Sequence, residues 1–204
     1  MSKQVESVAY HEAGHMTAAV VQAMPIRASG LHVDLHGYGC ADYFERRVGD
    51  LAVKEVDRQE RKFTIIALFA AHMAQLRFHP DCQQDGWGND LEKVKGLIRE
   101  MHLTNEQAQT LQEELRQRAR KLVDDYWPVI EELAKTLLSK TSTFMSHEDA
   151  RWGIGTLKRH MPGTEIKEFF ARYNIQVKIV SDDVRDYDST QDVPHYDSLA
   201  DQGN

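Results

Sequence analysis

The sequence has few cysteines, no long apolar run and no leader-like start. Cys40 and Cys82 are too few for a disulfide framework, so we expect a reducing compartment. No apolar stretch approaches the roughly 18 residues that a membrane-spanning helix needs. The opening "MSKQVESVAYHE" lacks the apolar core of a signal peptide. Together these absences predict a cytoplasmic protein without a membrane span.

The chain also lacks the positive charge that is typical of nucleic-acid-binding proteins. Its formal net charge is −7, whereas a protein that binds DNA or RNA normally presents a basic face. The negative charge is concentrated in residues 181–204, which contain seven aspartates, one arginine, and no glutamate or lysine. Because this acidic tail has few apolar anchors, we expect it to be disordered.

Helical periodicity runs through most of the 204 residues, a length that suits one domain or one domain with an appendage. A first helix is predicted over 5–24, where Pro25 ends it. A long apolar helix is predicted over 53–78, at the centre of the core. The other predicted helices are 91–102; 104–139, opened by a capping box and bent at 127–128; one that starts near 146–149 and runs to 157; and 164–173.

A short stretch between the first two helices has a different pattern. In "LHVDLH", residues 31–36, apolar residues alternate with polar ones, which predicts a half-buried strand with His32 and His36 at the surface. Gly37 and Gly39 then indicate a turn into a second strand around 41–46. The expected fold class is therefore mainly α with a small β-sheet or hairpin.

The first predicted helix contains the pattern H-E-x-x-H, within "SVAYHEAGHMTAAVV". Positions i and i+4 lie about one helical turn apart, so His11 and His15 can converge on one ion. Zinc accepts two neutral imidazoles, and Glu12 lies alongside, able to take a proton from a zinc-bound water. Gly14 in mid-helix indicates that another segment passes close to the backbone there. The alternative is a core helix whose histidines are satisfied by hydrogen bonds.

A catalytic zinc site needs a third protein ligand, which this helix does not supply. Metzincins place a glycine and a third histidine soon after the motif, and "MTAAVV" contains neither. The third ligand must therefore lie well downstream in the chain.

Four segments follow one another in the chain: "VAYHEAGHMTAAVV", "RKFTIIALFAAHMAQLRF", "GWGNDLEKVKGLIREM" and "LQEELRQRARKLVDDYWPVIEELAKTLLSK". In this order, over about residues 5–150, they resemble the peptidase domain of the FtsH-type AAA proteases, peptidase family M41. The first segment is similar to the zinc helix of that family, and the second lies where the family has its "LGGRAAEE" helix. The third is similar to the segment whose aspartate is the third zinc ligand, and the fourth to the late helices.

The resemblance implies a zincin-type metalloprotease domain over 1–150, in which His11, His15 and Asp90 hold Zn2+ and Glu12 is the catalytic base. The fourth position on the ion stays open, as a catalytic site requires. Asp90 also has a simpler explanation, because the helix dipole favours a carboxylate at a helix N-terminus. After this domain we expect a helical extension over 151–180 and then the acidic tail over 181–204.

The chain departs from the family in two respects. It contains neither the G-x-x-x-x-G-K-[ST] loop of an ATPase nor a membrane anchor, so the resemblance implies a stand-alone, ATP-independent peptidase. The "GGRAAE" pattern is replaced by residues 70–75, so a family glutamate near the active site becomes Gln75 and two glycines are lost. These changes put in question the hydrogen bonds that would orient the zinc ligands and the close packing of this helix. His72, in the same stretch, is expected to be a packed histidine.

In that family an edge strand beside the zinc helix binds an extended peptide by strand addition. Here "LHVDL" and the turn after it correspond to that strand, and backbone pairing would hold a peptide with little demand on its sequence. The alternative is an ordinary hairpin that covers the core. The expected partner is thus a protein or peptide substrate, not a nucleic acid. The sequence leaves open whether the chain forms a homo-oligomer and whether a separate ATPase delivers its substrates.

Two functions of different classes follow from these features. The first is a zinc metalloendopeptidase that hydrolyses peptide bonds in flexible or unfolded segments. The second is a catalytically weak or inactive adaptor or regulatory module of the same fold, which Gln75 and the lost glycines favour and the intact Glu12 opposes. A helical scaffold with an accidental motif is a third reading, and it predicts no stoichiometric zinc.

Overall fold

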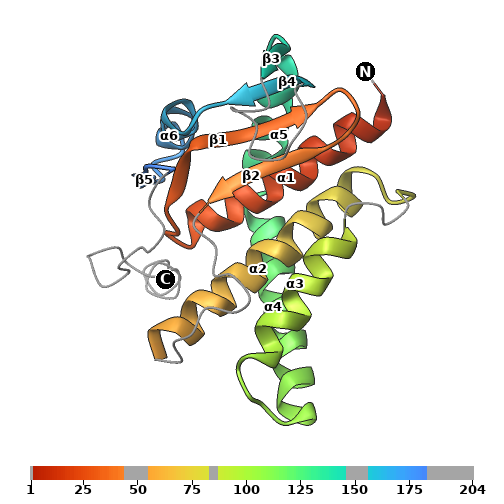
Figure 1. Cartoon of the computed structure of the whole chain (residues 1–204), viewed down its shortest axis with the longest axis vertical. Coiled ribbons are helices and arrows are strands. Elements are labelled where there is room, and N and C mark those ends of the chain that lie inside the picture. The colour runs from red at the N-terminus through yellow and green to blue at the C-terminus, as the bar shows by residue number, and fades with distance from the viewer. Residues whose placement is uncertain (1, 44–54, 83–86, 146–155, 183–204) are drawn as a thin grey trace.

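The computed structural model describes residues 2–43, 55–82, 87–145 and 156–182 (Figure 1). The fold is mainly helical with one small sheet, which confirms the expected fold class. Its elements are α1 (Lys3–Val21), β1 (Ile26–Asp34), β2 (Gly39–Tyr43), α2 (Glu55–Phe78), α3 (Trp87–Arg99), α4 (Asn105–Asp125), α5 (Trp127–Ser139), β3 (Thr143–Met145), β4 (Thr156–Met161), α6 (Gly163–Ala171) and β5 (Ile179–Val180). Among the described residues, none of the helices combines the length and apolar character needed to cross a lipid bilayer.

Helix α1 lies at the centre of the fold, as Figure 1 shows, with β1 and β2 on one side and α2 on the other. Its N-terminus is capped by Ser2, whose hydroxyl accepts a hydrogen bond from the backbone N–H of Val5. Almost every residue of α1 after Glu6 is buried, including the polar ones. A helix that is buried all round must satisfy its polar side chains inside the protein.

Helices α1 and α2 approach each other closely at Gly14. A Cβ atom added at this position would lie 2.8 Å from the Cα atom of Ala71 and 2.9 Å from the Cβ atom of Ala74. This confirms the prediction that another segment passes close to the backbone there. The two helices pack directly, because small residues line both sides of the contact.

The sheet has the strand order β2-β1-β4-β3, with antiparallel pairs, and β5 adds a short parallel pairing to β1. Leu31 and Val33 of β1 are fully buried, in agreement with the predicted alternation. The assignment of "LHVDL" to the edge of the sheet is wrong, because β1 pairs with β2 on one side and with β4 on the other. The edge of the described sheet nearest to α1 is β2.

The turn between β1 and β2 is organised by Asp34. Its carboxylate accepts hydrogen bonds from the backbone N–H groups of His36 and Tyr38, at 2.8 and 2.9 Å. Gly37 adopts a φ of 85°, a left-handed conformation that glycine reaches without strain. Asp34 is therefore buried and Leu35 exposed, the reverse of the alternation expected at this end of the strand.

Two of the predicted helices differ from the structure at their ends. The capping box of Thr104 and Gln107 is present, and the bend predicted at 127–128 is a break at Tyr126, after which α5 begins with Pro128 in its first turn. Helix α3 begins at Trp87, four residues before its predicted start at 91. Asp90 consequently lies within the first turn of this helix.

The helical extension predicted over 151–180 is wrong in its first described part. Residues from Thr156 form strand β4, which pairs with β1 and β3, so the helix predicted to run to 157 is not formed there. Six residues carry too little periodicity to separate a strand from a helix, and the neighbouring strands decide. The second predicted helix is confirmed as α6. Of the acidic tail, only Ser181 and Asp182 are described, and the rest of that prediction lies outside the described residues.

His32 is half-buried rather than a surface residue. It faces Lys158 on β4, whose ammonium group lies 3.3 Å from its Nε2 atom. Burial and, to a smaller extent, the positive charges of Lys158 and His160 lower the pKa of His32 from 6.5 to about 4, although Asp42 and Asp34 partly offset this effect. His32 is therefore neutral in the folded protein near pH 7.

The close contact at Gly14 predicts that Gly14→Ala destabilises the protein. Alanine favours a helix by about 1 kcal/mol over glycine, but its methyl group would overlap the backbone of Ala71, at an expected net cost of about 1–3 kcal/mol. Gly88→Ala is the matched control, because a Cβ atom there meets nothing within 4 Å. Denaturant unfolding measures both variants. Equal stability of the two would contradict the packing described for α1 and α2.

The lowered pKa of His32 predicts a loss of stability in mild acid. The unfolded chain takes up a proton near pH 6.5 and the folded chain only near pH 4, so the free energy of unfolding falls as the pH drops through this window. His32→Gln should remove roughly 2 kcal/mol of that fall between pH 7 and pH 5. Urea unfolding of the original chain and of His32→Gln at pH 7 and pH 5 measures this difference. If the free energy of unfolding falls equally in both proteins, the prediction is wrong.

Candidate metal centre

Helix α1 carries three polar residues of the H-E-x-x-H motif into the interior. The exposed fractions of His11, Glu12 and His15 are only 6%, 7% and 6%. The two histidines lie one turn apart, with their ring centroids 4.8 Å apart and the rings nearly perpendicular. Both Nε2 atoms point to the same place, at a distance of 3.2 Å from each other.

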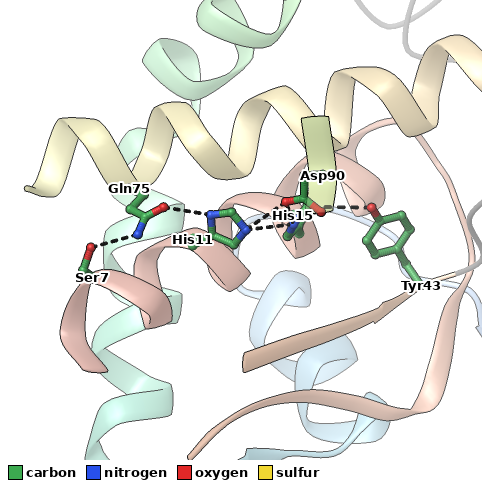
Figure 2. Close-up of polar contacts among 6 residues, drawn as sticks. All are labelled: Ser7, His11, His15, Tyr43, Gln75 and Asp90. Carbon is green, nitrogen blue, oxygen red and sulfur yellow. Dashed lines mark hydrogen bonds and ion pairs between the residues drawn. The ribbon is translucent and has the colours of Figure 1, made fainter. Parts of the chain in front are cut away.

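Asp90 completes this group from the first turn of α3, as Figure 2 shows. Its Oδ2 atom lies 3.0 Å from Nε2 of His11 and 3.1 Å from Nε2 of His15. The position at a helix N-terminus favours its negative charge, but the Asp90 side chain is only 11% exposed and turned to the imidazoles. The structure therefore brings together the three residues that the resemblance implied as ligands.

The charges of these groups are strongly coupled. Burial alone would raise the pKa of Asp90, but the charge of His15 and hydrogen bonds from both imidazoles outweigh it, so the pKa of Asp90 is well below its usual value. Burial likewise opposes the charged form of His15, but the Asp90 carboxylate prevails and raises the pKa of His15. Asp90 is consequently ionised at neutral pH.

Hydrogen bonds alone cannot satisfy all three contacts of this triangle while Asp90 is ionised. If both Nε2 atoms carry protons, two donors face each other across 3.2 Å. If only one does, the other nitrogen turns a lone pair toward the Oδ2 atom of Asp90 at about the same distance. Every protonation state leaves at least one contact between like groups, whereas a cation satisfies the three lone pairs together.

The triangle also has the size of one face of a tetrahedral metal site. Ligand atoms about 2.0–2.1 Å from a zinc ion lie roughly 3.3–3.4 Å from one another, close to the observed 3.0, 3.1 and 3.2 Å. Two imidazoles and a carboxylate are ligands that zinc accepts. Within the described part of the chain, His11, His15 and Asp90 are the one group of histidine, cysteine and acidic side chains that could hold a metal ion.

The remaining ring nitrogen of each histidine has its own partner (Figure 2). Nδ1 of His11 lies 3.1 Å from the side-chain oxygen Oε1 of Gln75, whose Nε2 donates to the hydroxyl of Ser7 at 3.2 Å. Nδ1 of His15 lies 3.5 Å from the hydroxyl of Tyr43. Such outer contacts orient metal-binding imidazoles and set which nitrogen carries the proton.

Glu12 lies beside this group but is not one of its ligands. It packs under β2, where Gly39 makes room for it, since a Cβ atom on Gly39 would lie 2.5 Å from Cγ of Glu12. Burial raises the pKa of Glu12, and the neighbouring imidazoles partly offset this effect. A carboxyl group with a raised pKa next to a metal position is suited to take up and return a proton.

The sequence indicated some of these residues and missed others. His11, Glu12 and His15 came from the motif and Asp90 from the resemblance. Gln75 stood out only as a departure from the family, whereas it contacts His11 directly. Ser7 and Tyr43 were missed, because no motif marks them, although Ser7 lies four residues before His11 and so on the same helix face. His72 is half-buried on α2, and burial lowers its pKa.

Neither a scan against protein-family models nor a search of curated proteins found a match for this chain. The resemblance to the FtsH-type peptidases therefore rests on the motif residues themselves. If the motif were accidental, there would be no reason for Asp90, which is 75 positions from His15 in the chain, to lie next to the two histidines. The convergence of both histidines on this carboxylate is the geometric observation that bears on the resemblance.

The triangle predicts that the purified chain binds zinc at about one ion per molecule and that Asp90→Ala lowers the affinity by at least 100-fold. Two imidazoles remain in that variant, which is one ligand fewer than structural or catalytic zinc sites use. Elemental analysis and competition with a chelator measure the content and the affinity. His36→Ala, which removes an exposed histidine, is the control. Zinc binding that is indifferent to Asp90 would refute this site.

Proposed function

We propose that the chain is a zinc metalloendopeptidase of the M41 type, with a zincin-type fold, that cleaves flexible or unfolded protein segments without ATP. One observation carries the proposal. His11, His15 and Asp90 converge from two helices on one position, and a buried carboxyl group, Glu12, lies next to them without being part of the triangle. Structural zinc sites are closed by four protein ligands, whereas a three-ligand set leaves one position for chemistry.

The proposed division of labour follows from the donor set. His11, His15 and Asp90 would hold the ion, which supplies a Lewis acid that polarises a carbonyl and makes water nucleophilic near neutral pH. Glu12 takes the proton of the attacking water and returns it to the departing amine. Its raised pKa supports this role, because the proton must be held between the two steps.

Strand β2 is the proposed site of substrate backbone binding. The backbone N–H of Asp34 donates to the carbonyl of Tyr38, so alternation along an antiparallel pair turns the N–H and C=O groups of Gly39 and Ala41 away from β1. A peptide added along this edge would pass beside Glu12, which contacts Gly39. Pairing through the backbone makes little demand on the sequence of the peptide.

The state of the substrate follows from the same geometry. Strand addition requires an extended segment, and folded proteins rarely expose one. The sequence contains no G-x-x-x-x-G-K-[ST] loop that would power unfolding. We therefore propose flexible or unfolded segments as substrates. Degradation of a tightly folded protein by the purified chain alone would contradict this part of the proposal.

A catalytically inactive adaptor is the second candidate. It was favoured by the loss of the family glutamate at position 75 and of two glycines. Gln75 nevertheless contacts His11, and Ala71 packs against Gly14, so neither change leaves a gap in the described structure. These contacts support the peptidase, and the variant below distinguishes the two functions.

Glu12→Gln should abolish peptide cleavage and leave the zinc content unchanged. The amide keeps the size of the side chain but takes up no proton, and loss of a general base costs about 100-fold to 10,000-fold in rate. Cleavage of casein and metal analysis of the same preparation test this expectation. Glu6→Gln, nearly two turns nearer the N-terminus of α1, is the matched control and should retain activity. If neither the original chain nor Glu12→Gln cleaves casein, and both bind protein partners equally well, the adaptor is favoured.

A further inference from the structure

The metal site has an outer layer in which Gln75 occupies the central place. Its amide lies between α1 and α2 and joins Ser7 to His11 (Figure 2). All three residues are more than nine-tenths buried, with exposed fractions of 6% for Gln75, 2% for Ser7 and 6% for His11. Water is thus largely excluded from this chain of hydrogen bonds.

We propose that Gln75 is a positioning residue, which, anchored by Ser7, orients the ring of His11 and favours a proton on its Nδ1 atom, so that Nε2 is available to bind the metal. The inference rests on the proposed metal site and adds to it. It gives a function to the position at which the chain departs from the resembled family, and it makes Ser7 part of the site.

The direction of each hydrogen bond carries the argument. A glutamine amide has one donor end and one acceptor end. The donor end, Nε2, faces the hydroxyl of Ser7 at 3.2 Å, so the acceptor end, Oε1, faces Nδ1 of His11 at 3.1 Å. An amide oxygen can only accept, so this contact favours a proton on Nδ1 of His11, in competition with the Asp90 carboxylate, which favours one on Nε2. When the single N–H group of the neutral imidazole is on Nδ1, Nε2 keeps a lone pair for the metal.

The opposite orientation of the amide would defeat the site. Its NH2 group would then face Nδ1 of His11, which would have to accept, and the proton would move to Nε2. That proton would point at the position between His15 and Asp90, where both partners lie within 3.2 Å. In the observed orientation the hydroxyl of Ser7 accepts from the NH2 group and anchors the amide, and a metal on Nε2 of His11 favours the same orientation, because Nδ1 then carries the proton.

The neutral charge of Gln75 matters as much as its oxygen. Glu12 and Asp90 already bring two carboxyl groups into a site whose members are less than a tenth exposed. Together they balance one divalent cation. A carboxylate at position 75 would also accept a hydrogen bond from His11, but it would add a third negative charge. That charge would stabilise the metal-bound protein and destabilise the metal-free protein.

The contact of His15 with Tyr43 is a weaker counterpart. The distance from the Tyr43 hydroxyl to Nδ1 is 3.5 Å, against 3.1 Å for Gln75 and His11. A longer hydrogen bond orients its partner less firmly. We therefore expect Tyr43→Phe to have a smaller effect than changes at Gln75.

Three variants at the outer layer test the inference. Gln75→Met keeps the length of the side chain without hydrogen bonds and should weaken zinc binding by about 10-fold to 100-fold. Ser7→Ala removes the partner that anchors the amide and should have a smaller effect in the same direction. Gln75→Glu restores the acceptor and should bind zinc at least as tightly as the original chain, while its metal-free form melts at a lower temperature.

Two measurements separate positioning from packing. Competition with a chelator gives the zinc affinity, and long-range 15N NMR of the metal-free protein at alkaline pH reports which nitrogen of His11 carries the proton. The original chain and Gln75→Glu should show a larger share of the proton on Nδ1 than Gln75→Met, in which only the contact with Asp90 remains and favours Nε2.

Gln22→Met is the matched control. Gln22 is also buried, at 2%, and its amide donates across the same two helices to the carbonyl of Phe63 at 3.2 Å. Gln22→Met should lower the melting temperature but change neither the zinc affinity nor the position of the proton on His11. The inference is overturned if Gln75→Met behaves in the same way. If the original chain binds no zinc, the proposed function fails, and the proton position on His11 still decides this inference.

Discussion

The arrangement depends on one contact, in which a single carboxylate oxygen of Asp90 meets two imidazole nitrogens that lie 3.2 Å apart. The three residues are more than nine-tenths buried, and buried charges are unfavourable unless their partners compensate them. With the carboxylate ionised, no distribution of protons makes all three contacts favourable. A divalent cation does so, which is why we interpret the cluster as a metal centre rather than as a set of satisfied core histidines.

The packing of α1 against α2 makes this contact possible. Gly14 allows the two helices to approach until only small side chains, those of Ala71 and Ala74, fit between them. Gln75 follows Ala74 directly, so the same approach that packs the core brings the amide to His11. Stability and the proposed function are therefore coupled here. The glycines that the resembled family has on α2 are absent, and in the described structure the glycine of α1 provides the close approach.

The position of Glu12 is the strongest argument for chemistry over simple binding. A metal site that only stabilises a fold has no use for a buried carboxyl group outside the ligand set, because burial raises its pKa and costs free energy. Glu12 is nevertheless accommodated by Gly39, the residue of β2 that leaves space for it. The same strand is an edge of the described sheet. A candidate base, a candidate metal position and an extended edge thus lie side by side, which is the arrangement that the proposed peptide hydrolysis requires.

Most of the helices and half of the site were predictable from local sequence patterns. Periodicity and caps located α1, α2 and α4, and the i, i+4 spacing placed His11 and His15 on one face, because these features depend only on neighbours within a few residues. Tertiary structure decided the rest. The six residues of β4 form a strand because β1 and β3 lie beside them, and β2 rather than β1 is the edge. Asp90, Gln75 and Tyr43 reach the histidines only through packing of separate elements, and no local pattern encodes which distant side chain will fill a given space.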